Sequence, residues 1–311
     1  MCLGLESPSP QSRAPSPKRS ERQRSARTER SARKMSQLLD ILTTAAILYA
    51  VAAGLLIVFG VMKIINFAHG GFLTVGGYSA LAVTKLGIDP WFALAFAFVI
   101  GFVCGMIIER LVVRPLYSRP LDAILATWGL GIIIGQVITL AFGREVQFVQ
   151  SPVTGAVALL GASYSEYRLI LVVIAVVLAV ALGLILNGTR LGLVTRAVIM
   201  NEDLARGLGI NSGLVRFATF SLGAGLASLA GALITPLSSV DPNMGVPWLV
   251  NAFMLVMVSG VSLVSLAFAC LVLGGAQVLV STYGNPILGG LTIVVLAALV
   301  LRFRAQGFAR D

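Results

Sequence analysis

Long apolar runs without apolar–polar alternation fill this chain from about residue 38 to residue 303, and they decide what it can fold into. Apolar residues make up 57% of the sequence and charged residues only 12%, about half the charged fraction of a soluble domain. A backbone in lipid must satisfy its own hydrogen bonds, and unbroken runs favour helices over a barrel. We therefore predict an all-α, polytopic transmembrane bundle of about eight membrane segments.

Six of these runs are long enough to cross a bilayer as single helices, which takes about 20 apolar residues. They are residues 38–61, 91–112, 122–142, 167–187, 214–236 and 285–303. Two further regions are irregular. Residues 64–84 are interrupted by polar residues and paired glycines, so we expect a broken or re-entrant element there. Residues 248–283 are too long for one helix and contain a weak break near Gly260.

The first 34 residues differ from the rest of the chain. They hold nine Lys or Arg and three Glu, so +6 of the net charge of +10 lies there. A Ser-, Arg- and Pro-rich segment with little to bury is expected to be disordered. It could bind nucleic acid or anionic lipid, or it could be a start-site artefact upstream of Met35. We favour the artefact, expect no nucleic-acid partner, and treat residues 35–311 as a single transmembrane domain surrounded by membrane lipid.

Basic residues indicate the orientation. They cluster after residue 109, in the loop 187–216 and near the C-terminus, whereas residues 143–168 hold two and residues 237–248 none. The positive-inside rule makes the three basic connections cytoplasmic. We expect a multi-pass protein of a bacterial inner membrane with its N- and C-termini in the cytoplasm, if 64–84 begins and ends on one side. If that region spans the membrane, the N-terminus is external.

Four polar side chains at membrane depth are candidates for a solute pathway: Asn66, His69, Thr127 and Gln136. Asn66 and His69, the only histidine of the chain, lie three residues apart and would share a helix face. An amide or an imidazole in hydrocarbon needs a partner, so these groups either line a pathway or bond a carbonyl of a neighbouring helix. No carboxylate accompanies His69, and no P-loop, nucleophile elbow or metal-ligand spacing occurs. We predict no enzyme, no cofactor and no metal.

The loop 187–216 interleaves apolar and charged residues. Over 196–210 this pattern predicts a short amphipathic helix on the membrane surface, ended by Gly207 or Gly209. Its position between two spans makes it a candidate docking element.

Four segments in this order resemble the permease subunits of ATP-binding-cassette (ABC) importers for branched-chain amino acids: "INFAHGG", "RPLDAILATWGL", "NEDLARGLGIN" and "FSLGAGLASLAGAL". The resemblance runs from about Met35 to the C-terminus, and "RPLDAILATWG" and "ITPLSSVDPNMGVPWLVNAFMLVMVSG" are more similar to the urea and short-amide branch. It implies separate ATPase subunits, a periplasmic solute-binding protein and a second homologous permease subunit. It also implies that 196–210 couples to the ATPase through Arg196, Glu202, Asp203, Arg206 and Gly209.

The sequence departs from the family pattern at Gly71, where an acidic residue is usual, and around Gly260, where a glycine-rich run is reduced. We expect a permease subunit that moves branched-chain amino acids, urea or short amides, energised by ATP hydrolysis on partner subunits. The alternative is an ion-coupled transporter or a channel. A carrier of that kind needs intramembrane carboxylates, whereas Glu109 and Asp122 lie at interfaces, and a channel has no need of the amphipathic loop.

Overall fold

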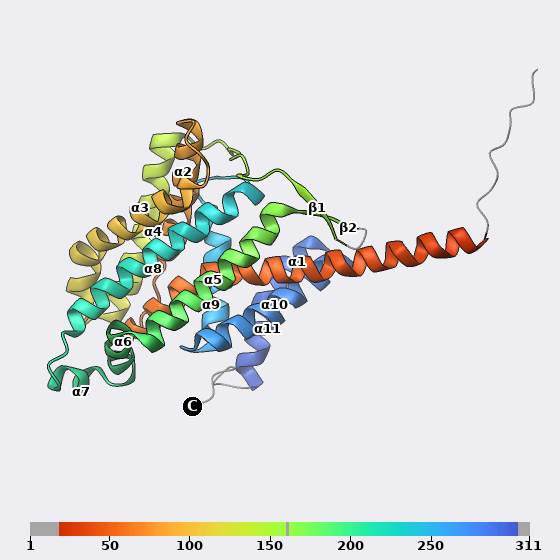
Figure 1. Cartoon of the computed structure of the whole chain (residues 1–311). Helices are drawn as coiled ribbons and strands as arrows, with labels where there is room; N and C mark the ends of the chain where they lie inside the picture. Colours follow the sequence, from red (N-terminus) through yellow and green to blue (C-terminus); the bar gives the residue numbers. More distant parts are fainter. Residues whose placement is uncertain (1–18, 160–161, 304–311) are drawn as a thin grey trace, which may run out of the picture.

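The computed structural model describes residues 19–159 and 162–303, which form a helical bundle with one small hairpin (Figure 1). The α-helices are α1 (Arg19–Met62), α2 (Ala68–Lys85), α3 (Phe92–Ile108), α4 (Pro120–Phe142), α5 (Glu166–Gly188), α6 (Arg190–Met200), α7 (Glu202–Gly207), α8 (Ser212–Ile234), α9 (Gly245–Ser259), α10 (Leu263–Tyr283) and α11 (Pro286–Phe303). Short π and 3-10 turns are η1 (Glu109–Val113), η2 (Arg114–Leu116) and η3 (Thr235–Leu237), and the strands are β1 (Ala156–Leu159) and β2 (Ala162–Ser165). Seven segments of this part of the chain are long and apolar enough to cross a membrane, which confirms the predicted fold class.

The break predicted near Gly260 separates α9 from α10. Gly260 has φ 65°, a left-handed conformation that glycine adopts without a steric cost. The hydroxyl of Ser262 then accepts a hydrogen bond from the amide of Ser265 (3.4 Å) and caps α10.

Helix α1 begins much earlier than the predicted span, and it projects well beyond the bundle in Figure 1. Residues 19–34, expected to be disordered, are helical. No Pro or Gly interrupts the chain between Pro17 and Gly54, and extending an existing helix avoids the cost of nucleation. The rest of the expected tail, residues 1–18, lies outside the described residues. The antiparallel pairing of β1 with β2 was also not predicted from the sequence.

Helix α8 lies at the centre of the bundle and packs against α1, α2 and α3. The backbones of α2 and α8 touch, because a Cβ on Gly76 would collide with the carbonyl oxygen of Ser228, and one on Gly231 with that of Leu73. The hydroxyl of Ser228 donates to the carbonyl of Phe72 (2.8 Å) across the same seam. Small residues that allow such contact hold helices together in lipid.

The bundle has two ends: a hairpin end, where β1 and β2 lie, and a loop end, where the loop 187–216 with α6 and α7 lies (Figure 1). At the hairpin end, Asp40 of α1 pairs with Arg168 of α5 (2.9 Å), and Gln37 of α1 donates to the hydroxyl of Tyr283 at the end of α10 (2.9 Å). At the loop end, the last turns of α1 lie against Ile199 of α6 and Val261. The ends of α3, α5 and α11 and the starts of α4, α8 and α10 share this loop end.

Helix α2 completes a broken crossing. Met62 ends α1 at the loop end, but His69 bonds the carbonyl of Val51 (2.9 Å), eleven residues earlier on α1 and thus about 16 Å back along the helix. Residues 63–67 cover that distance without helical structure, starting at Lys63 with φ 52°. Helix α2 then runs on to the hairpin end. The break expected within 64–84 lies at its start, before Ala68, whereas the paired glycines lie inside the continuous helix α2.

Helix α9 belongs to a second broken crossing, which also consists of a non-helical segment followed by a helix. Residues 238–244 enter from the hairpin end, and α9 starts where Gly245 meets the backbone of Gly70, then runs to the loop end. Because each broken element completes a crossing, Gln37 and Phe303 lie at opposite ends of the bundle. This geometry does not fit the predicted topology with both termini on one side.

Candidate functional site

Asn66 and Thr127 meet at the start of α2 and satisfy backbone amides that the broken helix leaves free. The side-chain oxygen of Asn66 accepts from the amide of Ala68 (3.1 Å). The Thr127 hydroxyl, from α4, accepts from the amide of Phe67 (3.2 Å) and donates to the carbonyl of Ile124 (2.9 Å). Asn66 and Thr127 are 4% and 2% exposed. Both side chains therefore stabilise the backbone conformation of the break before α2.

His69 lies between α2 and α1 and is fully buried. Its Nε2 atom is 2.9 Å from the carbonyl oxygen of Val51, and a Cβ added to Gly54 would lie 3.4 Å from its Cε1 atom. Its Nδ1 atom has no hydrogen-bond partner among the described residues. This is the helix-to-helix contact that the packing alternative anticipated.

Gln136 is separated from the other three candidates. It is exposed on the outer surface of α4, on the same side as Trp128 and Ile132, which are 58% and 55% exposed. The inner side of α4 packs on the break through Gly131, next to the carbonyl of Phe67 (3.5 Å from an added Cβ). The structure thus joins Asn66 and Thr127, places His69 behind them, and leaves Gln136 on the surface.

Gly71, where the family pattern has an acidic residue, packs against Ile134 of α4. An added Cβ would lie 3.0 Å from the Cδ1 atom of Ile134. A glycine here therefore lets α2 and α4 approach closely, and this part of the contact between α2 and α4 is apolar.

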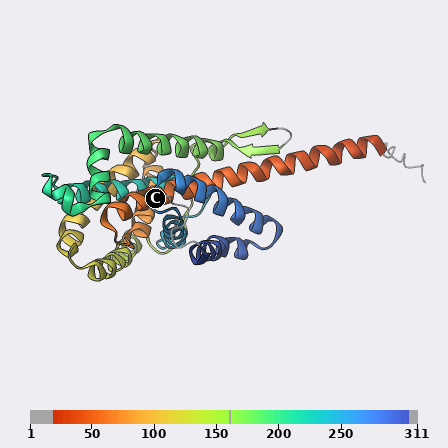
Figure 2. The ribbon, with the colours of Figure 1, turned by 90° about the horizontal axis from the view of Figure 1, so that it is seen from below.

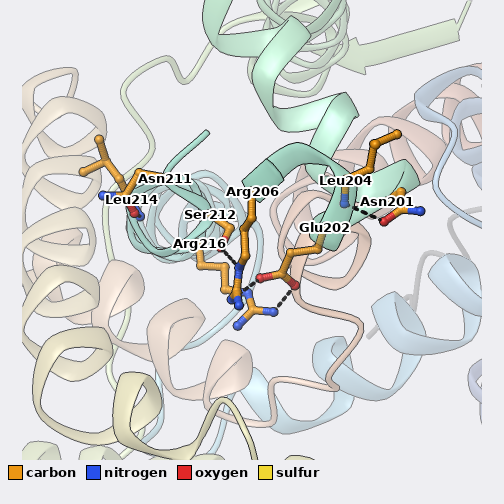
Figure 3. A network of polar contacts seen from close by, with 8 residues as sticks. All are labelled: Asn201, Glu202, Leu204, Arg206, Asn211, Ser212, Leu214 and Arg216. Carbon is orange, nitrogen blue, oxygen red and sulfur yellow. Dashed lines mark hydrogen bonds and ion pairs between the residues drawn. The ribbon is translucent and has the colours of Figure 1, made fainter. Parts of the chain in front are cut away.

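The candidates in the loop 187–216 lie on two helices rather than one. Asn201 ends α6 and begins α7, and its side-chain oxygen accepts from the amide of Leu204 (3.0 Å) (Figure 3). An Asn side chain competes with the helix backbone in this way, which explains the break within 196–210. Helix α7 ends at Gly207, and Gly209 follows with φ 83°, so the predicted glycine stop is confirmed.

Glu202 is the centre of the loop's polar network (Figure 3). Its carboxylate pairs with Arg206 of α7 (2.7 Å) and with Arg216 of α8. Arg206 also donates from Nε to the hydroxyl of Ser212 (2.8 Å). Burial alone would raise the pKa of Glu202, but the hydrogen bond with Ser212 and the charges of Arg216 and Arg206 outweigh it and lower the pKa. The ionised form is therefore favoured, and it fastens α7 to α8.

The two remaining charged candidates of the loop lie outside this network. Arg196 donates to the side-chain oxygen of Asn187 at the end of α5 (3.2 Å). Asp203 is exposed and makes no hydrogen bond or ion pair within the described residues. Only Glu202 and Arg206 of the predicted set thus act together.

Sequence reasoning missed the continuation of this network into the bundle. The guanidinium of Arg216 lies 4.6 Å from the ring centre of Tyr117, whose hydroxyl donates to the carboxylate of Glu109. Glu109 is fully buried in the π turn that follows α3. Burial, followed by the bond to Glu109, raises the pKa of Tyr117. The available signal was a lone carboxylate at the end of an apolar run.

Large apolar side chains of the loop are exposed on the single chain. Met200, Leu204 and Leu208, spaced four residues apart, are 84%, 63% and 74% exposed. An exposed apolar surface on a stiffened element indicates contact with a protein or with a membrane.

A helical membrane bundle with two broken crossings and a stiffened loop at one end defines a membrane transport protein. The family model described as "Branched-chain amino acid transport system / permease component" matches residues 37–303, and this chain belongs to that family of permease components. The family is one of transport permeases, not of enzymes.

Curated relatives agree with this assignment. The chain is 28% identical over 290 residues to the high-affinity branched-chain amino acid transport system permease protein LivH of Salmonella typhimurium, covering 88% of this chain and 94% of the relative. It is 28% identical over 295 residues to BraD of Pseudomonas aeruginosa (88% and 94% covered). It is 30% identical over 227 residues to a probable LivH of Methanocaldococcus jannaschii (70% and 72% covered).

Among solved structures, the chain is similar to "PsaBC from Streptococcus pneumoniae in complex with Fab". The TM-score is 0.48 at 16% identity, with 88% of this chain and 92% of that chain covered. A likeness of this degree carries no argument about function.

Proposed function

We propose that residues 35–311 form the permease subunit of an ABC importer that moves branched-chain amino acids across a bacterial inner membrane. The loop end of the bundle faces the cytoplasm, because it carries the basic connections. Separate ATPase subunits supply the energy, and a periplasmic binding protein delivers the solute at the hairpin end. The family match and the names of the relatives support the solute class.

The observation that carries this proposal is the construction of α7. Leu204 of α7 and Leu208, the residue after its end, are exposed, while Glu202 binds the helix to Arg216 of the central α8. An apolar helix surface seated in a groove is a common mode of protein recognition. A stiff connection to α8 lets movement of a bound ATPase reach the membrane helices.

The solute pathway in this proposal lies along the outer surface of α4, between this subunit and a second homologous permease. A polar side chain in a membrane span normally faces a protein or a water-filled cavity, and Gln136 is exposed on the single chain. Asn66, His69 and Thr127 then hold the broken helix behind the pathway. Hydrogen bonding without a buried charge allows weak binding and release.

The alternatives differ in their requirements. An ion-coupled carrier needs a carboxylate available within the membrane, but the buried Glu109 is bonded to Tyr117. A channel has no use for an outward-facing α7. The expected likeness to the urea branch rests on sequence phrases alone, so urea is the competing solute for the experiment below.

The test is uptake of labelled leucine and labelled urea by the complete reconstituted system, with and without ATP. We expect ATP-dependent leucine uptake that excess urea does not reduce. ATP-dependent urea uptake would move the protein to the urea branch, and ATP-independent uptake would contradict the importer.

The double variant Leu204→Ser/Leu208→Ser tests coupling. We expect about a tenfold loss of affinity for the ATPase subunits, about 1.4 kcal/mol, and a matching loss of uptake. Leu193→Ser is the control, because Leu193 is 64% exposed on the neighbouring α6. Equal affinity of the double variant and the control would show that α7 does not dock the ATPase.

A further inference from the structure

Helices α5 and α8 meet at the hairpin end and separate toward the loop end. At the hairpin end, the hydroxyl of Tyr167 donates to the carbonyl of Leu233 (2.8 Å), and Leu171 packs nearby. At the loop end, α6 contacts both helices and closes the space between them at that end. Figure 2 shows α5 along one edge of the bundle, between the hairpin and α6. The result is a wedge-shaped cleft at the edge of the bundle.

This cleft has a volume of about 610 Å³ and an almost entirely apolar lining. Its walls come from α1, α5, α6 and α8, through Ile57, Leu182, Ile185, Val194, Leu214 and Leu222. Ile185 and Leu214 are 41% and 63% exposed on membrane-spanning helices, so the cleft opens where lipid would lie. A cavity of this size and polarity, open at the edge of a membrane protein, suits a hydrocarbon chain.

The mouth of the cleft is positive. Arg190, the first residue of α6, lines it, is exposed, and has no ion-pair partner in the part of the chain that the structure describes. The first turns of α6 and α8 also line the cleft, through Gly192 and Asn211, and helix N-termini favour negative charge. No carboxylate occurs among the lining residues.

We propose that this cleft binds one anionic phospholipid, with an acyl chain between α5 and α8 and the phosphate at Arg190. The apolar walls favour an acyl chain over a polar ligand. The unpaired guanidinium of Arg190 at the membrane surface favours an anionic headgroup over a neutral one. The site does not depend on which solute the permease moves. Because α6 is both the floor of the cleft and the start of the coupling loop, the lipid supports that loop from behind.

The test compares lipids retained by the purified full chain after reconstitution with equal amounts of phosphatidylglycerol and phosphatidylcholine, measured by native mass spectrometry. Ala218→Trp fills the cleft, since Ala218 lines it. Ala181→Trp is the matched control on the exposed surface of α5, outside the lining. We expect Ala218→Trp to lose the tightly held lipid and Ala181→Trp to keep it. Equal retention by both variants would overturn the site.

The headgroup is tested by Arg190→Gln against Arg144→Gln, an exposed arginine at the hairpin end. We expect Arg190→Gln to lower the preference for phosphatidylglycerol about fivefold, the effect of one basic residue near an anionic surface (about 1 kcal/mol), with Arg144→Gln unchanged. An unchanged preference in Arg190→Gln would overturn the anionic headgroup. A protein bound in the cleft in place of any lipid would overturn the proposal as a whole.

Discussion

At the residue scale, one carboxylate holds α7 of the loop 187–216 against α8. Glu202 is half-buried and pairs with two arginines, whereas its neighbour Asp203 is exposed and unpaired among the described residues. The pair with the exposed Arg206 contributes little, but Arg216 is only 14% exposed in its side chain. Removing the charge of Glu202 would leave that guanidinium without its carboxylate.

We predict that Glu202→Gln destabilises the loop by about 1–3 kcal/mol, because a charged hydrogen bond to a partly buried Arg216 is lost. The measurements are proteolysis of the loop and affinity for the ATPase subunits. Asp203→Asn is the control and should behave as the unaltered protein. If both variants lose affinity equally, the network does not position α7.

The pH dependence gives a second readout of the same pair. The pKa of Glu202 lies below its ordinary value of 4.5 in the folded protein. The stabilisation is therefore complete above that value and is lost as the pH falls through the lowered pKa. The difference between the unaltered protein and Glu202→Gln should persist at neutral pH and disappear only in acid below the ordinary value. A difference that disappears near neutral pH would contradict this assignment.

His69 gives the second prediction at this scale. The ring fills space between α1 and α2 and bonds the carbonyl of Val51. His69→Ala should lower stability by about 2–4 kcal/mol through a cavity and a lost bond, and His69→Gln, which keeps a donor, by less. Thermal unfolding in detergent measures the order. Uptake per folded molecule should be unchanged in His69→Gln; a large fall would instead place His69 on the solute pathway.

At the element scale, the α2–α8 seam requires glycine. A Cβ at position 76 would meet the carbonyl oxygen of Ser228, which belongs to the backbone of α8 and has little freedom to move. We predict that Gly76→Ala costs about 1–3 kcal/mol by overpacking, measured as a lower melting temperature. Gly183→Ala is the control, because nothing lies within 4 Å of a Cβ there. Equal melting temperatures would show that α2 and α8 are not in backbone contact.

The same elements show what a sequence can predict. Apolar run length located α4, α5 and α11 to within a few residues, since lipid imposes a minimum length on a helix. Polar interruptions located the breaks near Asn66 and Gly260. Run length could not show where the chain goes after a break, because that depends on contacts such as that of Gly70 with Gly245. It also could not show that Gln136 faces outward while Thr127 faces inward, since no apolar–polar contrast marks the sides of α4.

At the scale of the whole molecule, the two broken crossings set the topology. Residues 63–67 with α2, and residues 238–244 with α9, each carry the chain from one end of the bundle to the other. A count of long apolar helices alone omits α2 and α9 from the seven candidates. Including both puts Gln37 and Phe303 on opposite sides. If the basic loop end lies in the cytoplasm, as proposed above, the start of the transmembrane domain is external.

We predict the reaction of single cysteines with a membrane-impermeant maleimide, in a chain whose Cys2, Cys104 and Cys270 are replaced by alanine. Leu38→Cys should react in intact cells, as should Ser238→Cys at the hairpin end, because both lie outside the cytoplasm. Asp203→Cys, on α7, should react only after the cells are opened.

Comparing the three cysteine variants tests two statements separately: that α2 completes a membrane crossing, and that the loop end lies in the cytoplasm. If Leu38→Cys reacts only in opened cells, together with Asp203→Cys, then α1 crosses from the cytoplasm outward, residues 64–84 begin and end on the outer side, and the crossing through α2 is wrong. If Leu38→Cys and Ser238→Cys agree with each other but exchange roles with Asp203→Cys, the crossing stands and the membrane orientation is reversed. In that case the exposed Leu204 and Leu208 would face away from any cytoplasmic ATPase, and α7 could not couple to it.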